Sequence, residues 1–533
     1  MTSNNLDRSL DAVIVGAGFA GIYMLHRLKN MGLRAKVFES AGGIGGTWYW
    51  NRYPGARCDV TSLEYSYSFS EELQQEWSWT ERYAGQAEIL QYLEHVVERF
   101  QLADDIILNT RVSETSFDEK TLRWSVTSSS GIYNAKYCVM ATGPLSTTNS
   151  PDFPGLSSYE GETYHTGTWP HEDINFAGRT VGIIGTGSSG IQSTPVIAEQ
   201  AEHLYVFQRT PNFSVPAGNH ALSAADQNDI KADYAGFREQ QRKLPAACHH
   251  LPRRESALDA SPEKREQIYD DYWKKGGLSF LGAFNDLLTK PDANETAANF
   301  IRDKIRQIVK NPAIAEKLCP DHLFGCKRPC SDTGYYESFN RSNVSLIDVA
   351  ETPIETFTNK GIKVSDNEIK LDSVIFATGF DAMTGTLEKI KIVGRNAVTL
   401  TEAWSAGPCS YLGLSVVGFP NLFIMTGPGS PSVLANMVTG AEQHAEWISD
   451  CIKFIEDNDL STIEATEKAQ NDWVEHVNTV ADTTIYPTCN SWYLGANIPN
   501  KPRIFMPYIG GFQRYERRCL EIQAEGYPGF MLA

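Results

Sequence analysis

Two glycine-rich segments, each lying between a short apolar run and an amphipathic run, constrain the fold of this 533-residue chain most strongly. The first, Gly16-Ala17-Gly18-Phe19-Ala20-Gly21, follows an apolar run at residues 11–15 and precedes a segment with helical spacing. A second apolar run, residues 35–38, ends in Glu39, which lies 23 residues after Gly16. This order predicts a βαβ unit in which the backbone approaches a pyrophosphate at a helix N-terminus, and Glu39 accepts a hydrogen bond from a ribose hydroxyl.

The second segment, Gly185-Thr186-Gly187-Ser188-Ser189-Gly190, follows a strand-like run at residues 179–184. The next strand-like run, residues 203–207, is followed by Arg209 and Thr210 instead of an acid. A guanidinium can bind a 2′-phosphate bidentately, where a carboxylate would repel it. We therefore expect FAD at the first loop and NADPH at the second, although Arg209 could also be an ordinary surface arginine.

The two units predict an α/β fold with two Rossmann-like dinucleotide-binding domains. Ala-Thr-Gly segments at residues 141–143 and 377–379 suggest where the chain passes between the domains. A charge-rich stretch with helical spacing predicts a helical insertion on the second domain. The expected boundaries are 1–150 and 386–533 for the FAD-binding domain, 151–221 and 326–385 for the NADP-binding domain, and 222–325 for the insertion.

Charge and hydropathy exclude several function classes. The net charge of −18 disfavours nucleic acid and anionic membranes as partners. The N-terminal sequence lacks the pattern of a signal peptide, and the apolar stretch 411–426 contains Pro420 and is too short to span a bilayer. We therefore expect a cytoplasmic location.

The ten cysteines are scattered through the chain, which predicts reduced thiols and no disulfide framework. Cys319, Cys326 and Cys330 lie near His322, but no paired C-x-x-C motif supports a zinc site there. No metal is expected.

Four further segments carry side chains whose roles the residues alone leave open. Residues 42–59 are rich in glycine and aromatic residues, which suits a flat ligand, and end in Asp59, either a partner for a cation or an exposed acid. The adjacent Lys327 and Arg328 form either a surface pair or a pair of cations in an anionic cofactor site. The Gly/Pro/Ser loop at 427–437 precedes a helix and could shape a substrate pocket. Residues 159–170 predict a turning connector with a buried tryptophan and a hydrogen-bonded histidine.

The connector between the two loops resembles a family fingerprint. The pattern Tyr159-x-Gly161-x3-His165-x3-Trp169-Pro170 is similar to that of the type I (class B flavoprotein) Baeyer–Villiger monooxygenases, with tyrosine where the fingerprint has phenylalanine. The stretch from Gly46 to Asp59 resembles a second motif of this family. The similarity extends over essentially the whole chain, and residues 51–59, 427–432 and 491–493 resemble the phenylacetone and steroid monooxygenases most closely.

The resemblance implies a reaction. NADPH would reduce FAD, the reduced flavin would form a C4a-peroxyflavin with O2, and this species would attack a ketone to give an ester or lactone. Arg328 corresponds to the catalytic arginine, whose permanent charge stabilises anions, and Asp59 corresponds to its positioning partner. His165 and Trp169 would be linker residues that couple domain motion to catalysis.

The resemblance also implies sets of binding residues. The expected FAD-binding residues are Gly16, Gly18, Ala20, Gly21, Glu39, Gly46, Thr47, Trp48, Tyr49, Trp50, Asp59, Tyr65, Val112 and Met437. The expected NADP-binding residues are Gly185, Thr186, Gly187, Ser188, Ser189, Gly190, Gln192, Arg209, Thr210, Lys327, Arg328 and Trp492. The expected substrate pocket is formed by Val60, Pro144, Leu145, Val433, Leu434 and Met437, and its apolar character suits an aryl, cyclic or steroid-like ketone.

Two other functions remain possible at this point. A related flavin monooxygenase could oxidise nitrogen or sulfur, but such enzymes generally lack the Trp-Pro ending of the fingerprint. A non-catalytic dinucleotide-binding protein would predict a broken phosphate loop or no Arg328. The sequence identifies neither the ketone, nor the regio- and enantioselectivity, nor the oligomeric state, nor the extent of sulfoxidation.

Overall fold

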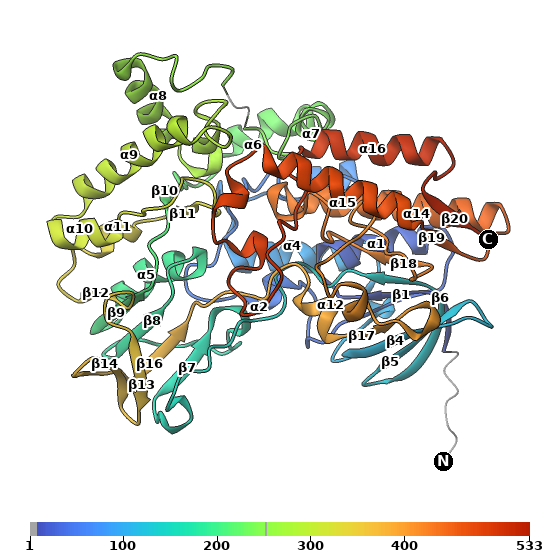
Figure 1. Ribbon diagram of the computed structural model, residues 1–533, viewed down its shortest axis with the longest axis horizontal. Coiled ribbons are helices and arrows are strands. Elements are labelled where there is room, and N and C mark those ends of the chain that lie inside the picture. Colours follow the sequence, from blue (N-terminus) through green and yellow to red (C-terminus); the bar gives the residue numbers. More distant parts are fainter. Residues whose placement is uncertain (1–7, 251–252) are drawn as a thin grey trace.

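The computed structural model describes residues 8–250 and 253–533. Residues 1–7 and 251–252, which fall within the expected FAD-binding region and helical insertion, lie outside the described residues. Two sheets form the centres of two lobes, and helices cover them (Figure 1). The chain enters the first lobe, crosses to the second, and returns to the first.

The first sheet has eight strands in the order β17-β4-β5-β6-β1-β2-β3, with β18 also paired to β6. β1 pairs in parallel with both β2 and β6, as the first glycine loop predicts. The strands β4, β5 and β6 pair antiparallel. The bounds are β1 Ser9–Val15, β2 Ala35–Phe38, β3 Ile106–Ile107, β4 Val112–Asp118, β5 Arg123–Ser128, β6 Gly131–Met140, β17 Lys391–Val393 and β18 Leu422–Ile424.

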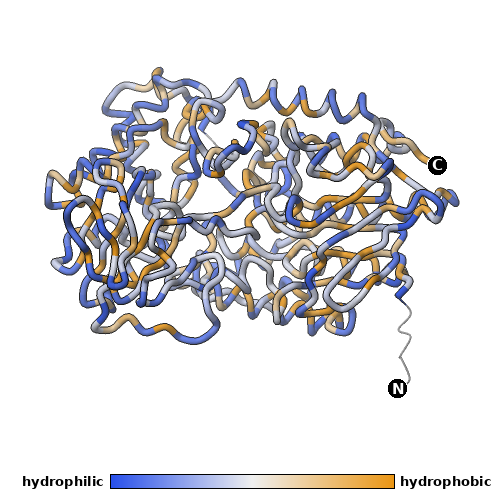
Figure 2. The backbone as a smooth tube through the Cα atoms, turned by 60° about the horizontal axis from the view of Figure 1, so that its bottom comes forward, coloured by the Kyte–Doolittle hydropathy of each residue, from blue (hydrophilic) through white to orange (hydrophobic). Residues whose placement is uncertain are grey.

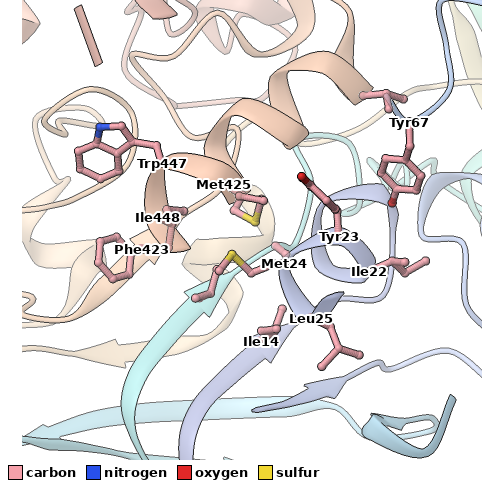
Figure 3. Close-up of a cluster of buried hydrophobic side chains, with 14 of the residues drawn as sticks. Ile14, Ile22, Tyr23, Met24, Leu25, Tyr67, Phe423, Met425, Trp447 and Ile448 are labelled. Carbon is pink, nitrogen blue, oxygen red and sulfur yellow. The ribbon is translucent and has the colours of Figure 1, made fainter. Parts of the chain in front are cut away.

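The core of the first lobe lies between this sheet and the long helix α14 (Met437–Asp457). The helix α1 (Phe19–Asn30) buries Ile22 and Leu25, and α14 packs against this helix and contributes Ile448 to the same cluster, beside Phe423 and Met425 (Figure 3). The helix α4 (Gln86–Arg99) adds a buried stripe at Ile89, Leu93 and Val96, which is the helical spacing that the sequence predicts. The strand and the helix that flank the first glycine loop are thus fixed by a packed core.

The second sheet has five parallel strands in the order β12-β9-β8-β16-β7. Their bounds are β7 Glu162–His165, β8 Thr180–Ile184, β9 His203–Gln208, β12 Val344–Asp348 and β16 Ser373–Phe376. The helix α5 (Ser188–Gln200) connects β8 to β9. The segment expected to be only a turning connector therefore contains an edge strand, β7. A four-residue strand that pairs on one side only is too short to show the alternation of apolar and polar residues by which a sequence predicts a strand.

The helices of residues 222–325 divide between the two lobes. Tyr234 and Phe237, on α7 (Tyr234–Arg242), pack against the first core, whereas Ile268 and Ile301, on α8 (Pro262–Lys275) and α9 (Pro291–Ile308), belong to the second core. The sequence placed the whole insertion on the second domain. The domain boundaries stay a prediction, and this packing argues for a division near residue 250.

The remaining elements are short or peripheral. The small strands are β10 Ser214–Pro216, β11 Cys330–Asp332, β13 Ile354–Thr358, β14 Gly361–Val364, β15 Asn367–Lys370, β19 Ile463–Ala465 and β20 Phe530–Leu532. The other α-helices are α2 Thr47–Trp50, α3 Glu71–Glu76, α6 Ala224–Lys231, α10 Pro312–Leu318, α11 Tyr335–Ser338, α12 Gly385–Lys389, α13 Leu400–Ala403, α15 Glu467–Asp482 and α16 Phe512–Ala524.

Apolar and polar residues alternate along the peripheral helices (Figure 2). The helix α9, for example, buries Ala297, Ile301 and Ile305 and exposes Glu295, Asn299 and Asp303. Within residues 8–250 and 253–533, none of the helices combines the length and the apolar character that crossing a bilayer requires.

Candidate active site

The first glycine loop is closed by backbone contacts that leave no room for a side chain. A Cβ on Gly16, whose φ is +107°, would lie 2.6 Å from the carbonyl oxygen of Ala141. A Cβ on Gly21 would lie 1.8 Å from the carbonyl oxygen of Gly16. Gly18 caps α1 without a side-chain hydrogen bond, so the first amide groups of the helix are available to an anion.

Glu39 is 5% exposed at the end of β2. Its carboxylate accepts hydrogen bonds from the backbone N–H of Ala17 at 2.7 Å and of Ala41 at 2.8 Å. The backbone carbonyl of Glu39 accepts from the N–H of Thr110 at 2.7 Å, which places the start of β4, with Val112, beside the same corner. The acid predicted to bind a ribose therefore lies directly against the loop.

The second glycine loop repeats this construction. A Cβ on Gly190 would lie 2.1 Å from the carbonyl oxygen of Gly185, and one on Gly185 would lie 2.5 Å from that of Ala377. A Cβ on Gly187 would meet nothing within 4 Å. The space in front of Gly187, at the uncapped N-terminus of α5, fits a phosphate group.

Two cations stand next to this second loop. Arg209 is exposed after β9, Lys327 is half-buried, and among the described residues neither makes a hydrogen bond or an ion pair with the protein. Burial lowers the pKa of Lys327, and the charge of Arg209 lowers it further, while Asp321 opposes the shift. An anionic 2′-phosphate would relieve the repulsion between these cations, so their arrangement fits NADP.

Arg328 and Asp59 form a bidentate ion pair between segments that lie far apart in the sequence. Arg328 Nε donates to Asp59 Oδ2 at 2.8 Å and Nη2 donates to Oδ1 at 2.9 Å. The side chains are 25% and 24% exposed. Burial alone would raise the pKa of Asp59, but Arg328 outweighs it and the pKa falls below its ordinary value. Burial opposes the charge of Arg328, yet Asp59 raises the pKa of the guanidinium well above its ordinary value.

The remaining N–H groups of Arg328 face the C-terminal part of the chain. Nη1 donates to the carbonyl oxygen of Val433 at 2.8 Å, and the hydroxyl of Tyr493 also lies within hydrogen-bonding reach of the guanidinium. Tyr493 is 1% exposed, and burial raises the pKa of its hydroxyl, so it stays neutral. Its ring centroid lies 4.2 Å from that of Trp492. The sequence reasoning selected Trp492 and missed Tyr493, since only the three-dimensional approach to Arg328 distinguishes the two.

The aromatic segment after Gly46 lies beside the first loop. A Cβ on Gly46 would lie 3.0 Å from the Cα of Gly18. Trp48, on α2, donates its indole N–H to the Tyr65 hydroxyl at 3.2 Å. The expected FAD-binding residues that this brings together are Gly16, Gly18, Ala20, Gly21, Glu39, Gly46, Thr47, Trp48, Tyr49, Trp50 and Tyr65.

Four of the six expected pocket residues share one apolar cluster. Leu145, Val433, Leu434 and Met437 pack with Tyr493 and Phe505. Pro144 contacts the same region because its carbonyl oxygen accepts from the N–H of Met383 at 2.7 Å. Val60 instead belongs to the core of the first lobe.

The fingerprint residues tie the two lobes together. The Tyr159 hydroxyl donates to the carbonyl oxygen of Leu371 at 2.9 Å, and a Cβ on Gly161 would meet this hydroxyl at 2.2 Å. Trp169, which is 5% exposed and precedes Pro170, donates its backbone N–H to the carbonyl oxygen of Trp50 at 3.2 Å. The linker thus contacts the aromatic segment of the first lobe directly.

His165 is held on both ring nitrogens. Its Nδ1 accepts from the N–H of Gly167 at 3.0 Å, and its Nε2 lies 3.2 Å from the Thr378 hydroxyl. Burial lowers its pKa, so the ring is neutral near pH 7. These contacts suit a structural linker residue more than an acid–base group.

The cysteines differ from expectation in one place. Cys326 and Cys489 form a disulfide with a Cα–Cα distance of 6.0 Å, although the sequence predicted reduced thiols. Their separation of 163 residues hides this proximity from any spacing argument. Eight described cysteines, including Cys319 and Cys330, are free.

Comparison with known proteins extends this picture. Residues 13–235 match the family model described as pyridine nucleotide-disulphide oxidoreductase. A Baeyer–Villiger monooxygenase of Pseudooceanicola batsensis is 42% identical over 526 residues, which cover 98% of this chain and 96% of that protein. A phenazine N-monooxygenase of Lysobacter antibioticus is 41% identical over 527 residues, which cover 98% of this chain and 97% of that protein. The solved structure of an oxidised steroid monooxygenase bound to NADP is 50% identical, with a TM-score of 0.95 over 98% of this chain and 99% of that one.

The fold and the two loops define an FAD- and NADPH-dependent flavin monooxygenase with two dinucleotide-binding domains. Within this class, the chain belongs to the type I Baeyer–Villiger monooxygenases. The α/β fold class, the two cofactors and the family resemblance are thereby confirmed, whereas the role of each individual site residue is still a prediction.

Proposed function

We propose that this enzyme inserts one oxygen atom from O2 next to the carbonyl group of a bulky ketone, giving an ester or lactone at a centre formed by Arg328 and Asp59. The observation that carries the proposal is the bidentate pair of these residues beside an apolar cluster. The relatives named for Baeyer–Villiger and steroid oxygenation support this choice.

The cofactor and the protein divide the chemistry. FAD, which the first glycine loop and Glu39 would hold, would supply the hydride acceptor for NADPH and the reducing power that activates O2. Arg328 stabilises the negative charge that develops on the ketone oxygen during attack, and its raised pKa prevents it from losing a proton instead. Asp59 and the Val433 carbonyl oxygen fix the plane of the guanidinium, so that its charge is oriented before the reaction begins.

The second lobe selects the reductant in this proposal. Gly187 leaves space for the pyrophosphate, and Arg209 with Lys327 binds the 2′-phosphate. Trp492 is half-buried next to Tyr493, which contacts Arg328, and in this proposal it contacts the bound nucleotide. The site is thus assembled from both lobes and from the C-terminal segment.

The proposed substrate class follows from the apolar wall of Leu145, Leu434 and Met437. If these residues line the pocket, alanine at Leu434 and Met437 should lower kcat/KM for a steroid-like ketone about tenfold relative to a small cyclic ketone. An unchanged ratio between the two ketones would show that the pocket lies elsewhere.

The reaction itself is tested by reducing the holoenzyme anaerobically with NADPH and then adding oxygenated buffer with or without a bulky cyclic ketone. Wild type should form the lactone, and Arg328→Ala should still oxidise NADPH while losing about 10²- to 10³-fold in lactone formation, as expected for removal of an oxyanion-stabilising group. Arg328→Lys keeps a positive charge but cannot form the bidentate hydrogen bonds of a guanidinium, so it should retain only part of the wild-type lactone formation. Lactone formation by Arg328→Ala at the wild-type rate would refute the assignment.

The Lysobacter relative, named as an N-oxidising enzyme, makes N-oxidation the second candidate function. A soft nitrogen nucleophile needs no stabilisation of an attacked carbonyl oxygen, so N-oxide formation should not depend on Arg328 in this way. An aromatic N-heterocycle offered in competition with the ketone distinguishes the two functions. N-oxide as the main product, with no lactone, would favour the rival.

A further inference from the structure

The Cys326–Cys489 disulfide joins the two segments that carry the proposed nucleotide and ketone contacts. Cys326 is fully buried in the loop between α10 and β11, and the same loop carries Lys327 and Arg328. Cys489 follows the turn η7 (Tyr486–Thr488) and lies shortly before the turn η8 (Trp492–Leu494). The bond therefore ties the arginine loop to the Trp492 segment.

Little regular structure holds the Trp492 segment in place otherwise. Between α15 and α16 the described chain forms only the turns η7 and η8. Residues 485–503 have few polar anchors to the rest of the protein: Ile485 N–H donates to Leu288 O at 2.9 Å, the Tyr493 hydroxyl contacts Arg328, Asn497 donates to Phe380 O at 2.7 Å, and Lys501 pairs with Asp381. Residues 504–511 are anchored separately, because Met506 O accepts from Gly429 N–H at 2.7 Å and Tyr508 N–H donates to Ser430 O at 2.8 Å. A covalent tie adds most where the chain has the fewest other constraints.

The arginine loop, in contrast, is held independently of the disulfide. Arg328 keeps its two hydrogen bonds to Asp59 and one to Val433, and two residues later Cys330 begins β11, which pairs with β10. Cleavage of the disulfide would thus loosen the Trp492 side and leave the Arg328–Asp59 pair in place.

We propose that the Cys326–Cys489 disulfide is a redox-sensitive latch that positions the Trp492 segment against the arginine loop. This inference rests on the proposed function, because it assigns nucleotide contact to Trp492. Cys489 is half-buried whereas Cys326 is fully buried, so reagents in solution reach the Cys489 sulfur first.

The chemistry of the latch balances in both directions. A dithiol reductant supplies two electrons and two protons, the S–S bond breaks, and the reductant leaves as its own disulfide. Hydrogen peroxide restores the bond: the Cys489 thiolate attacks a peroxide oxygen to give a sulfenic acid and hydroxide, and the Cys326 thiolate then displaces the second hydroxide. With the two thiol protons, the products are one disulfide and two molecules of water.

Opening the latch should weaken nucleotide retention. If the closed arrangement falls to about a tenth of the molecules, the apparent Kd for NADP+ rises about tenfold. Tryptic cleavage after the exposed Arg503 should accelerate in proportion to the open fraction, whereas the FAD content should not change.

The test uses the full-length holoenzyme in four forms: peroxide-treated wild type, dithiol-reduced wild type, Cys489→Ser, and the matched control Cys409→Ser, whose thiol is free and half-buried far from Arg328 in sequence. Thiol titration under denaturing conditions should give eight free thiols in the peroxide-treated form and ten after reduction. Reduced wild type and Cys489→Ser should show weaker NADP+ binding and faster cleavage at Arg503, and peroxide should reverse the effect only in wild type. Cys409→Ser should behave as wild type.

Ten free thiols after peroxide treatment would overturn the proposal, as would unchanged Kd and cleavage after reduction. Reversible reduction of wild type keeps the test valid even if Cys489→Ser folds poorly. Wild type that binds no NADP+ in either state would refute the proposed function instead, because the thiol count and the Arg503 cleavage report on the latch independently of nucleotide.

Discussion

The two glycine loops share one backbone design but present opposite charges at the end of the following strand. In the first, Glu39 is 5% exposed and satisfied by two backbone N–H groups. In the second, Arg209 is exposed and, within the described chain, makes no ion pair. The same fold thus places a hydrogen-bonded carboxylate at this position in one lobe and, among the described residues, a cation without an ion-pair partner in the other.

We propose that the backbone of each loop selects for a dinucleotide, while the side chain after the following strand selects which dinucleotide. A carboxylate accepts from ribose hydroxyls, and a guanidinium requires an anion. The proposed reacting centre joins two distant parts of the chain, since Arg328 lies in the loop before β11 and Asp59 follows the aromatic segment of the first lobe. Substitutions in either loop test this proposal.

The largest effect is expected where a methyl group meets the backbone. Gly21→Ala should abolish FAD retention, and Gly190→Ala should abolish NADPH-dependent reduction. The added Cβ atoms would lie 1.8 Å and 2.1 Å, respectively, from a backbone carbonyl oxygen, which is far closer than van der Waals contact allows. Flavin absorbance of the purified variants and anaerobic reduction by NADPH measure the two losses. A Gly190→Ala enzyme reduced normally by NADPH would contradict the assignment of the second loop.

Charge removal comes next. Arg209→Ala should raise KM for NADPH about 10- to 100-fold, the value of one or two charge-assisted hydrogen bonds, and leave KM for NADH unchanged. Initial rates with both nucleotides give the ratio directly. Glu39→Gln serves as the matched change in the first lobe and should lower FAD affinity without altering the NADPH to NADH preference. If Arg209→Ala affects both nucleotides equally, the arginine does not recognise the 2′-phosphate.

A smaller effect is expected at Gly187, where the added methyl group meets no protein atom within 4 Å. Gly187→Ala should therefore keep the thermal stability of wild type but raise KM for NADPH about tenfold, because the methyl group occupies space needed by the phosphate. Thermal unfolding without nucleotide and steady-state kinetics separate the two quantities. An unchanged KM would place the pyrophosphate away from this glycine.

The smallest effect concerns acid stability at the junction of the lobes. Because the folded pKa of Asp59 is lowered, its contribution to stability is present above the ordinary carboxyl pKa and disappears as pH falls through the lowered value. At pH 7 the free energy of unfolding of wild type should exceed that of Asp59→Asn by about 1 kcal/mol, a modest value because water screens a partly exposed ion pair. This difference in free energy should shrink below about pH 4. Urea unfolding across this range measures it, and a difference that grows in acid would contradict the ionised pair.

Much of the fold was accessible from the sequence because its signals are local. The glycine loops with their flanking strands predicted β1, β2, β8 and β9, and the spacing of Ile89, Leu93 and Val96 predicted α4. The ion pair of Arg328 and Asp59 was expected only from the family resemblance, since a sequence separation of 269 leaves no local signal.

The remaining features depend on long-range contacts. The edge strand β7 is defined by its pairing with β16, which enters more than 200 residues later in the chain. The disulfide partner of Cys326 and the approach of Tyr493 to Arg328 likewise follow from how the C-terminal segment folds back. The division of the helical insertion between two cores is decided by the packing of Tyr234 and Ile268, both of which read simply as apolar helical residues.

The most direct measurement is incorporation of ¹⁸O from labelled O2 during turnover of a bulky cyclic ketone with NADPH. We expect one labelled oxygen atom in the ester linkage of the lactone, formed in proportion to the NADPH oxidised, and loss of labelled lactone in Arg328→Ala while NADPH oxidation continues. Unlabelled product, or a labelled N-oxide with no lactone when ketone and N-heterocycle compete, would contradict it.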